Sequence, residues 1–279
     1  DMTLSDGDCF AAALDADTDG REGAYYLWQN EEIEQALGID AHDFGKIYDV
    51  RPQGNWQGNS VLNRLNHQGM FNDKREAQLK EMRGKLLEKR CTRTVPARDE
   101  KCLTDWNALA AVALAEAAET FENPVWHVRA KKIFDRLNTS DIAHCRIDGH
   151  VTADALLDDY AWMILAAVRL DEISAAEDLL QKARGKFADH ENGGFFTMPD
   201  NNLDLVRLKT VNDTALPSGN AVMVSALAAL AEKTDDQTHK NAAEDILRAF
   251  AGEIDQAAHA MGGYLAAAYG MMAATEKRS

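Results

Sequence analysis

Carboxylates and aromatic side chains occur together at the starts of apolar segments in this sequence. Trp106 follows Asp105, and Tyr160 follows Asp158 and Asp159. Carboxylates bind hydroxyl groups or transfer protons, and the flat rings of Trp and Tyr stack on sugar rings, so the combination is typical of carbohydrate sites. Two carboxylates facing each other across a cleft also support glycoside chemistry.

The candidate site combines three acids with a larger set of binding side chains. The predicted catalytic residues are Asp158, Asp159 and Asp213. The predicted substrate-binding residues are Asp99, Lys101, Trp106, Asn107, Tyr160, Arg207, Lys209, Ser218 and Asn220. A purely structural alternative applies to Asp105, Asp158 and Ser218, because each is a good N-cap for the helix that follows. Asp159 and Asp213 have no capping explanation of equal strength, which favours them as catalysts.

An internal repeat determines where these residues lie. Leu103–Ala108, Leu156–Ala161 and Leu216–Ala221 align at offsets of 53 and 60 residues, and each leads into an apolar helix. A more charged, amphipathic helix is predicted after each one, at Pro124–Leu137, Ile173–Phe187 and Gln237–Phe250. The repeated unit is therefore a helical hairpin, and one such hairpin cannot bury its apolar face without a neighbour.

Stacked hairpins predict an all-α fold, an α/α toroid or solenoid with the apolar helices inside and the charged helices outside. Parallel inner helices place their N-terminal ends, and therefore the candidate residues, on one face. We expect a single partial toroid domain over residues 1–279, with an irregular entry segment at 1–70 and hairpins at 71–279. Turn and strand signals after residue 193 predict a small inserted β-hairpin at Leu203–Lys209.

The first part of the chain carries fewer regular signals. Short and long helices are predicted at Asn30–Leu37 and at 72–89, with a loop rich in Gly and Asn at 48–59. Asp15–Gly20 matches the first half of a calcium loop of the EF-hand type, but its twelfth position is Tyr26, where a bidentate Glu is needed. We therefore interpret this motif as a structural turn.

No metal or cofactor is assigned from the sequence. The eight histidines form no H-x-x-x-H pattern, and the four cysteines form no C-x-x-C pair. No Walker, G-x-S-x-G or G-x-G-x-x-G pattern is present. His150 is the histidine considered as a general base, against the alternative of an ordinary loop residue.

The charge balance argues against polyanionic partners. With 30 basic and 46 acidic residues, the net charge is 30 − 46 = −16. Such a surface repels phosphate backbones and anionic lipids, so nucleic acid and membranes are not expected as partners. The sequence holds no apolar run of membrane-spanning length and does not start as a signal peptide does, so a cytoplasmic location is expected.

Several motifs resemble, in the same order, those of the YyaL family of thioredoxin-domain-containing proteins, which includes the spermatogenesis-associated protein 20 of vertebrates. The matching segments are Asp15–Trp28 (DADTDGREGAYYLW), Asp99–Asn107 (DEKCLTDWN), Leu157–Ala161 (LDDYA), Gly193–Thr197 (GGFFT) and Arg207–Asn220. The resemblance implies an N-terminal thioredoxin-like domain, absent from this sequence, followed by an (α/α)6 toroid similar to N-acylglucosamine 2-epimerases and six-hairpin glycosidases. The first toroid helices are also absent here. Where the family often has Ser, this chain has Asp105, which suits a helix cap.

Two hypotheses follow. In the first, the chain is part of a carbohydrate-active enzyme, an epimerase or a glycosidase-like hydrolase, acting on a sugar-like small molecule. An epimerase removes a proton next to a carbonyl, usually with His, and few histidines are placed for this. In the second, the toroid is a non-catalytic binding or scaffold module. Either way, open hairpin edges predict self-association or pairing with the missing N-terminal part.

Overall fold

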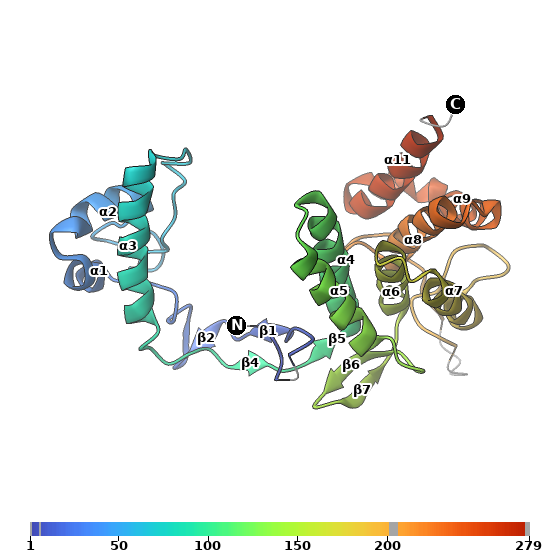
Figure 1. Cartoon of the computed structure of the whole chain (residues 1–279), viewed down its shortest axis with the longest axis horizontal. Coiled ribbons are helices and arrows are strands. Elements are labelled where there is room, and N and C mark those ends of the chain that lie inside the picture. The colour runs from blue at the N-terminus through green and yellow to red at the C-terminus, as the bar shows by residue number, and fades with distance from the viewer. Residues whose placement is uncertain (1, 6, 201–205, 277–279) are drawn as a thin grey trace. The chain divides into compact units, whose positions relative to one another are not determined.

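A computed structural model describes residues 2–5, 7–200 and 206–276 (Figure 1). The chain divides into two units, one formed by Asp1–Ala12 with Glu100–Ser279 and the other by Ala13–Asp99. This division differs from the single domain with a change at residue 70 that the sequence predicted. Within the smaller unit, the long helix after residue 72 packs against the helix at Asn30–Leu37.

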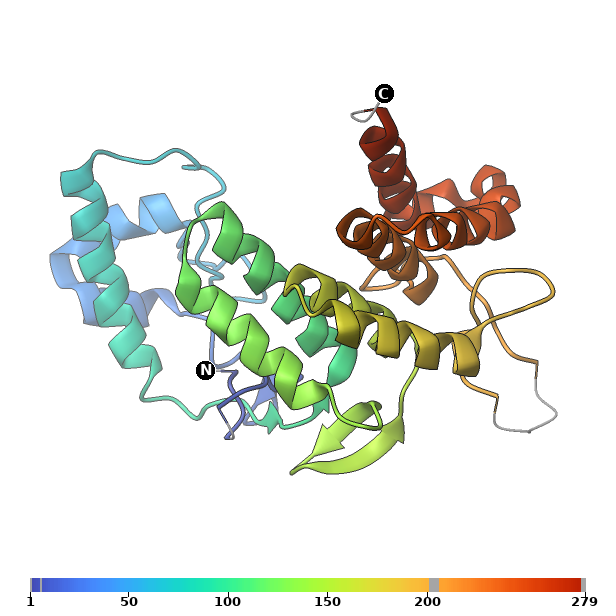
Figure 2. The same ribbon diagram turned by 45° about the vertical axis from the view of Figure 1, so that its right-hand side comes forward.

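The larger unit consists of helical hairpins in chain order (Figures 1 and 2). Its helices are α4 (Thr104–Thr120), α5 (Pro124–Leu137), α6 (Leu157–Arg169), α7 (Ile173–Phe187), α8 (Gly219–Thr234), α9 (Gln237–Phe250), α10 (Ile254–Ala257) and α11 (Gly262–Glu276), with short 3-10 turns at Ala251–Glu253 and Ala258–Ala260. The helices α4, α6, α8 and α11 pack against one another in a row, and α5, α7 and α9 each pack against the helix that precedes them. The predicted all-α class of repeated hairpins is confirmed.

Burial separates the two kinds of helix as the sequence pattern predicted. In α6 almost every side chain from Leu157 to Val168 is buried, because neighbours cover it on several sides. In the outer helices one face is buried, and its aromatic residues Phe134, Phe187 and Phe250 are at most 3% exposed. Burial of these apolar faces supplies the main free energy that holds each hairpin on the row.

A three-stranded antiparallel sheet of β5 (Cys102–Leu103), β6 (Ala143–Ile147) and β7 (His150–Asp154) leads into α4 and α6. The β6–β7 connection is a two-residue turn at Asp148 and Gly149, both with positive φ, as the right-handed strand twist favours. This hairpin was not predicted from the sequence. The one predicted at Leu203–Lys209 falls partly outside the described residues, and residues 206–209 form no strand.

The smaller unit is a helical cluster with one short hairpin and a separate antiparallel pair of strands. Its elements are β1 (Ala13–Leu14), β2 (Asp17–Thr18), β3 (Arg21–Glu22), α1 (Asn30–Leu37), a 3-10 turn (Gly38–Asp40), α2 (Ala41–Tyr48), α3 (Asp73–Arg90) and β4 (Arg98–Asp99). The hairpin is β2–β3, and the separate pair is β1–β4. Both predicted helices are confirmed, and Asn72 caps α3. The segment 1–70 is less irregular than expected, since it also holds α2. Asp19 and Gly20 form the turn between β2 and β3, so the predicted turn within the calcium-loop motif is present.

Two buried asparagines attach extended segments to the row of helices. Asn107 accepts a hydrogen bond from the backbone N–H of Phe10 at 2.7 Å and donates to the Phe10 carbonyl at 3.1 Å. Asn220, at the same position of its repeat, pairs in the same way with both backbone groups of Phe195 and also donates to the carbonyl of Thr210. Each side-chain amide thus pairs with both backbone groups of one residue, as a residue of a neighbouring β-strand would.

Replacing Asn220 by Ala should therefore destabilise the larger unit by about 2–4 kcal/mol, because three backbone groups lose their partner in a buried site. Urea denaturation of the two proteins measures the loss. Asn212→Ala, an exposed amide in the preceding loop, is the control and should change stability by less than about 0.5 kcal/mol. Equal effects of the two substitutions would show that the ladder-like pairing contributes nothing.

Candidate active site at the helix N-termini

Asp159 joins the starts of two helices. Its side chain is fully buried in the first turn of α6. Oδ1 accepts the backbone N–H of Asp105, in the first turn of α4, at 3.0 Å, and Oδ2 accepts the backbone N–H of Leu156 at 2.8 Å. Backbone N–H groups at helix starts lack intrahelical partners and carry partial positive charge, so they stabilise a buried carboxylate.

Two further carboxylates connect the next helices in the same manner. Asp158 receives the backbone N–H of Gly219 at the start of α8. Asp213 accepts the backbone N–H of Ser218 at 3.1 Å and that of Gly263, at the start of α11, at 2.7 Å. Neighbouring helices of the row therefore meet at their N-terminal ends, which confirms the predicted common face.

The capping roles differ from those predicted. Ser218 is the N-cap of α8, as expected. Asp105 and Asp158 are not N-caps, because α4 and α6 begin earlier, at Thr104 and Leu157. Asp159 and Asp213, for which the sequence offered no capping explanation of equal strength, do accept helix N–H groups. The prediction of capping roles considered only the helix that follows each acid. In the structure, the acids also accept N–H groups from the starts of neighbouring helices.

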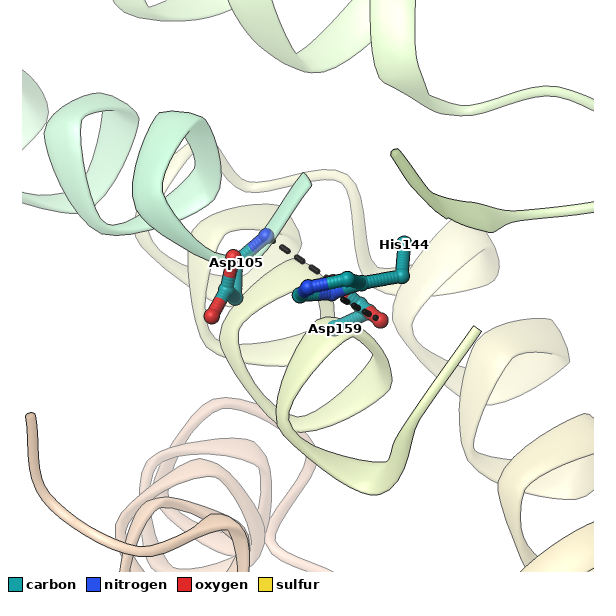
Figure 3. Close-up of side chains that lie close together, drawn as sticks. All are labelled: Asp105, His144 and Asp159. Carbon is teal, nitrogen blue, oxygen red and sulfur yellow. Dashed lines mark hydrogen bonds and ion pairs between the residues drawn. The ribbon is translucent and has the colours of Figure 1, made fainter. Parts of the chain in front are cut away.

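His144, which was not among the residues predicted from the sequence, completes the cluster. It lies on β6, and its Nδ1 is 3.1 and 3.2 Å from the two carboxylate oxygens of Asp159 (Figure 3). With the proton on Nδ1, the ring donates to Asp159, and within the described part of the chain no residue hydrogen-bonds Nε2. His150, the histidine considered from the sequence, lies exposed at the turn end of β7.

The buried charges shift the ionisation of this cluster. The pKa of Asp105 is raised to about 6, first by burial and then by the neighbouring charge of Asp159. Burial likewise raises the pKa of Asp158. The pKa of His144 is raised, chiefly by its hydrogen bond to Asp159. Asp105, which ionises near pH 6, therefore lies beside a His144 whose protonated form is favoured by its hydrogen bond to Asp159, which places a base and an acid in one site.

Asp105, His144 and Asp159 also have the side-chain types of a metal site. One potential ligand atom of each lies within 4.8 Å of the others. Both oxygens of Asp159, however, accept backbone N–H groups, and Nδ1 of His144 is hydrogen-bonded to them. These contacts account for the clustering, so the arrangement fits proton transfer better than cation binding.

Of the predicted binding residues, the exposed Trp106 suits the role and several buried ones do not. The Trp106 side chain is 44% exposed next to Asp105. Tyr160 is 1% exposed and packs against Phe187, so the prediction that its ring stacks on a sugar is wrong. The amides of Asn107 and Asn220 are occupied by backbone groups, as described above.

The remaining predicted binding residues are two cations in the segment before α8 and two residues in the segment before α4. Arg207 donates to the carbonyls of Met198 and Lys186, and Lys209 pairs with Asp189 at 2.7 Å. Both cations thus hold the segment that precedes α8. Asp99 belongs to the smaller unit and Lys101 to the segment before α4. Ligand contact by these four residues stays a prediction.

A cavity of about 510 Å3 lies between α6, α8 and α11. Small side chains such as Ala221, Ser225 and Ala267 line it, together with Trp162. It extends to Pro217 and Gly263, which lie beside Asp213 at the N-terminal face. Its volume is within the range of small-molecule sites.

No family model matches the sequence. An uncharacterised protein of Caenorhabditis elegans is 25% identical over 86% of this chain, and the chain spans only 40% of that relative. Similar solved structures include a GH76 α-mannanase from Bacteroides thetaiotaomicron (15% identity, 56% of this chain and 46% of that one, TM-score 0.45) and the cellobiose 2-epimerase of Bacillus thermoamylovorans (9% identity, 54% and 44%, TM-score 0.46). None of the described helices is both long and apolar enough to span a membrane.

The raised pKa of Asp105 predicts a pH-dependent effect of Asp105→Asn on stability. A carboxyl whose pKa rises from 3.8 to about 6 on folding stabilises the folded state at low pH. This contribution is lost as the pH rises through about 6. Asp105→Asn should therefore raise the unfolding temperature at pH 8 by more than at pH 4.5, as measured by circular dichroism. The exposed Asp154→Asn is the control, and a pH-independent effect of Asp105→Asn would contradict the burial of a charge.

Proposed function

We propose that this chain is part of a carbohydrate-active α/α toroid, related to the YyaL family, in which Asp105 and His144 transfer protons to and from a sugar. The observation that carries the proposal is the base–acid pair built around Asp159. The pKa of Asp105, about 6, is close to neutral pH, and a general base works best when its pKa is near the pH of the reaction. The buried Asp159 holds the His144 ring in one orientation, as a carboxylate behind a catalytic imidazole does.

The proton transfers of an epimerase fit this pair. Asp105 accepts the proton from a carbon next to the sugar carbonyl, and protonated His144 returns one to the same carbon from the opposite side through Nε2. Exchange with water then removes the proton from Asp105 and restores the one on His144. Trp106, exposed on the same helical turn as Asp105, offers a stacking surface for the ring. The shortage of placed histidines, which weakened the epimerase hypothesis, is removed by His144.

A glycosidase is the second candidate, supported by the raised pKa of Asp105, which suits a general acid. Its second carboxylate is harder to assign. Asp159 uses both oxygens on backbone N–H groups, and it lies within 4.8 Å of Asp105. An inverting mechanism requires about 6.5–9.5 Å between the carboxyl groups to admit water. A retaining mechanism requires about 5–5.5 Å and a carboxylate oxygen free to act as nucleophile. Because both oxygens of Asp159 already accept backbone N–H groups, the epimerase assignment has more support.

The test is proton exchange at carbon 2 of a sugar panel in D2O, followed by proton NMR with mannose, N-acetylmannosamine and cellobiose. A substrate should lose its carbon-2 proton signal and form its epimer. His144→Gln and Asp105→Asn should each lower the rate by at least about 100-fold, because each removes one proton-transfer group. His150→Gln, on the same β-hairpin, should leave it unchanged.

The pH profile of the exchange supplies a further check. The rate should rise through about pH 6, as Asp105 ionises, and fall above the raised pKa of His144. New reducing ends without carbon-2 exchange would support the glycosidase instead. Binding of a sugar without any turnover would favour the non-catalytic module, and exchange that survives both substitutions would refute the assigned residues.

A further inference from the structure

The cavity of about 510 Å3 between α6, α8 and α11 is a groove that follows α8. Ala221, Ser225, Ala228 and Glu232 line it at intervals of three or four residues, so they lie on one face of this helix. At a rise of about 1.5 Å per residue, this face is about 17 Å long, from the first turn of α8 to the last. The groove is therefore long enough for an extended ligand.

The middle of the groove is apolar, and small residues keep it open. Its lining includes Gly263, Ala267 and Gly270 on α11, and Trp162 and Leu165 on α6. A Cβ added at Gly270 would meet nothing within 4 Å, so the groove has room for a larger group there. Cavities of this volume hold small molecules in other proteins, and apolar walls favour the apolar part of a ligand.

The charged residues of the groove gather at one end. They lie at the C-terminal ends of α6 and α8 and in the turn into α9, and they are Arg169, Glu232, Asp235, Asp236 and Lys240. The guanidinium of Arg169 is already bound to Glu116 at 2.8 Å. Lys233, the basic residue in the last turn of α8, likewise pairs with Asp171.

The balance at this end is negative. Against the three carboxylates that line it, the ammonium of Lys240 is the cation that remains among the lining residues once Arg169 is paired. The carbonyl groups at the C-terminal end of α8 add partial negative charge. This end of the groove therefore attracts a cation and repels an anion.

We propose that this groove binds an amphipathic amine, whose apolar chain lies along α8 and whose protonated amino group lies beside Glu232. The side chain of Glu232 is exposed, and within the described residues it forms no ion pair, so its carboxylate is available to a cation. Burial of the chain supplies the affinity, and the acidic end selects the head group. The inference does not rest on the proposed function, because none of the three side chains of the cluster around Asp159 lines the groove.

The test compares three eight-carbon probes that differ in their head group: octylamine, octanol and octanoate. Isothermal titration calorimetry of the whole chain at pH 7 gives each Kd. Octylamine should bind at least about tenfold more tightly than octanoate, because the acidic end attracts one head group and repels the other. Octylamine should also shift the indole signal of Trp162 in proton–nitrogen NMR, and Trp162→Phe assigns that signal among the five tryptophans.

Variants separate the contribution of the head group from that of the chain. Glu232→Gln should weaken octylamine binding about two- to fivefold, the value of one exposed ion pair, and leave octanol binding unchanged. Lys240→Gln should strengthen octylamine binding, because it removes the competing cation. Gly270→Leu places a side chain in the groove and should weaken the binding of all three probes by at least about tenfold. This variant should remain folded, because Leu favours a helix more than Gly does.

Gly84→Leu is the matched control. Gly84 is also a glycine inside a helix whose added Cβ would meet nothing within 4 Å, but it lies in α3 of the smaller unit. This substitution and His144→Gln should leave the three affinities within about twofold. Octylamine binding that survives Gly270→Leu would place the amine on the acidic surface outside the groove and overturn the proposal. Octanoate binding as tight as that of octylamine, or no binding of any probe, would overturn it as well.

Discussion

The buried carboxylate of Asp159 is the interaction on which the larger unit and its candidate chemistry both depend. A carboxylate without exposure to water is strongly disfavoured unless it is hydrogen-bonded or paired. Here two helix starts and one imidazole provide the partners. The same contacts align α4 with α6 and hold the ring of His144, so the architecture and the arrangement of acid and base have one physical cause.

The same kind of contact, a carboxylate bound to the N–H groups at a helix start, recurs along the row of helices. Asp158 reaches the start of α8, and Asp213 joins α8 to α11. Gly219 makes the second junction possible, since a Cβ at this position would lie 2.9 Å from Leu157 and 3.1 Å from the Asp158 carboxylate. Parallel packing of inner helices thus concentrates unpaired N–H groups on one face, and the acids there neutralise them. Carboxylates on this face therefore have structural as well as chemical roles.

The hairpins were predictable because helix period and repeat spacing are local properties of the sequence. The site was predictable only in part. His144 reaches Asp159 through a strand, and no spacing in the sequence relates that strand to the start of α6. Tyr160 occupies the repeat position of Asn107 and Asn220, yet its ring points into the core, because residue type at a repeat position does not determine side-chain burial. Lys209 was predicted on the ligand face because its segment leads toward the start of α8, and the structure shows that it pairs with Asp189, a partner that the sequence does not indicate.

The most direct test of the central claim is an NMR titration of His144 in the wild type and in Asp159→Asn, with circular dichroism to confirm that the variant remains folded. The account predicts that His144 titrates above its ordinary pKa of 6.5 in the wild type, and that Asp159→Asn lowers this pKa more than Asp105→Asn does, because the hydrogen bond to Asp159 is the largest cause of the shift. An unchanged His144 pKa in a folded Asp159→Asn variant would contradict it.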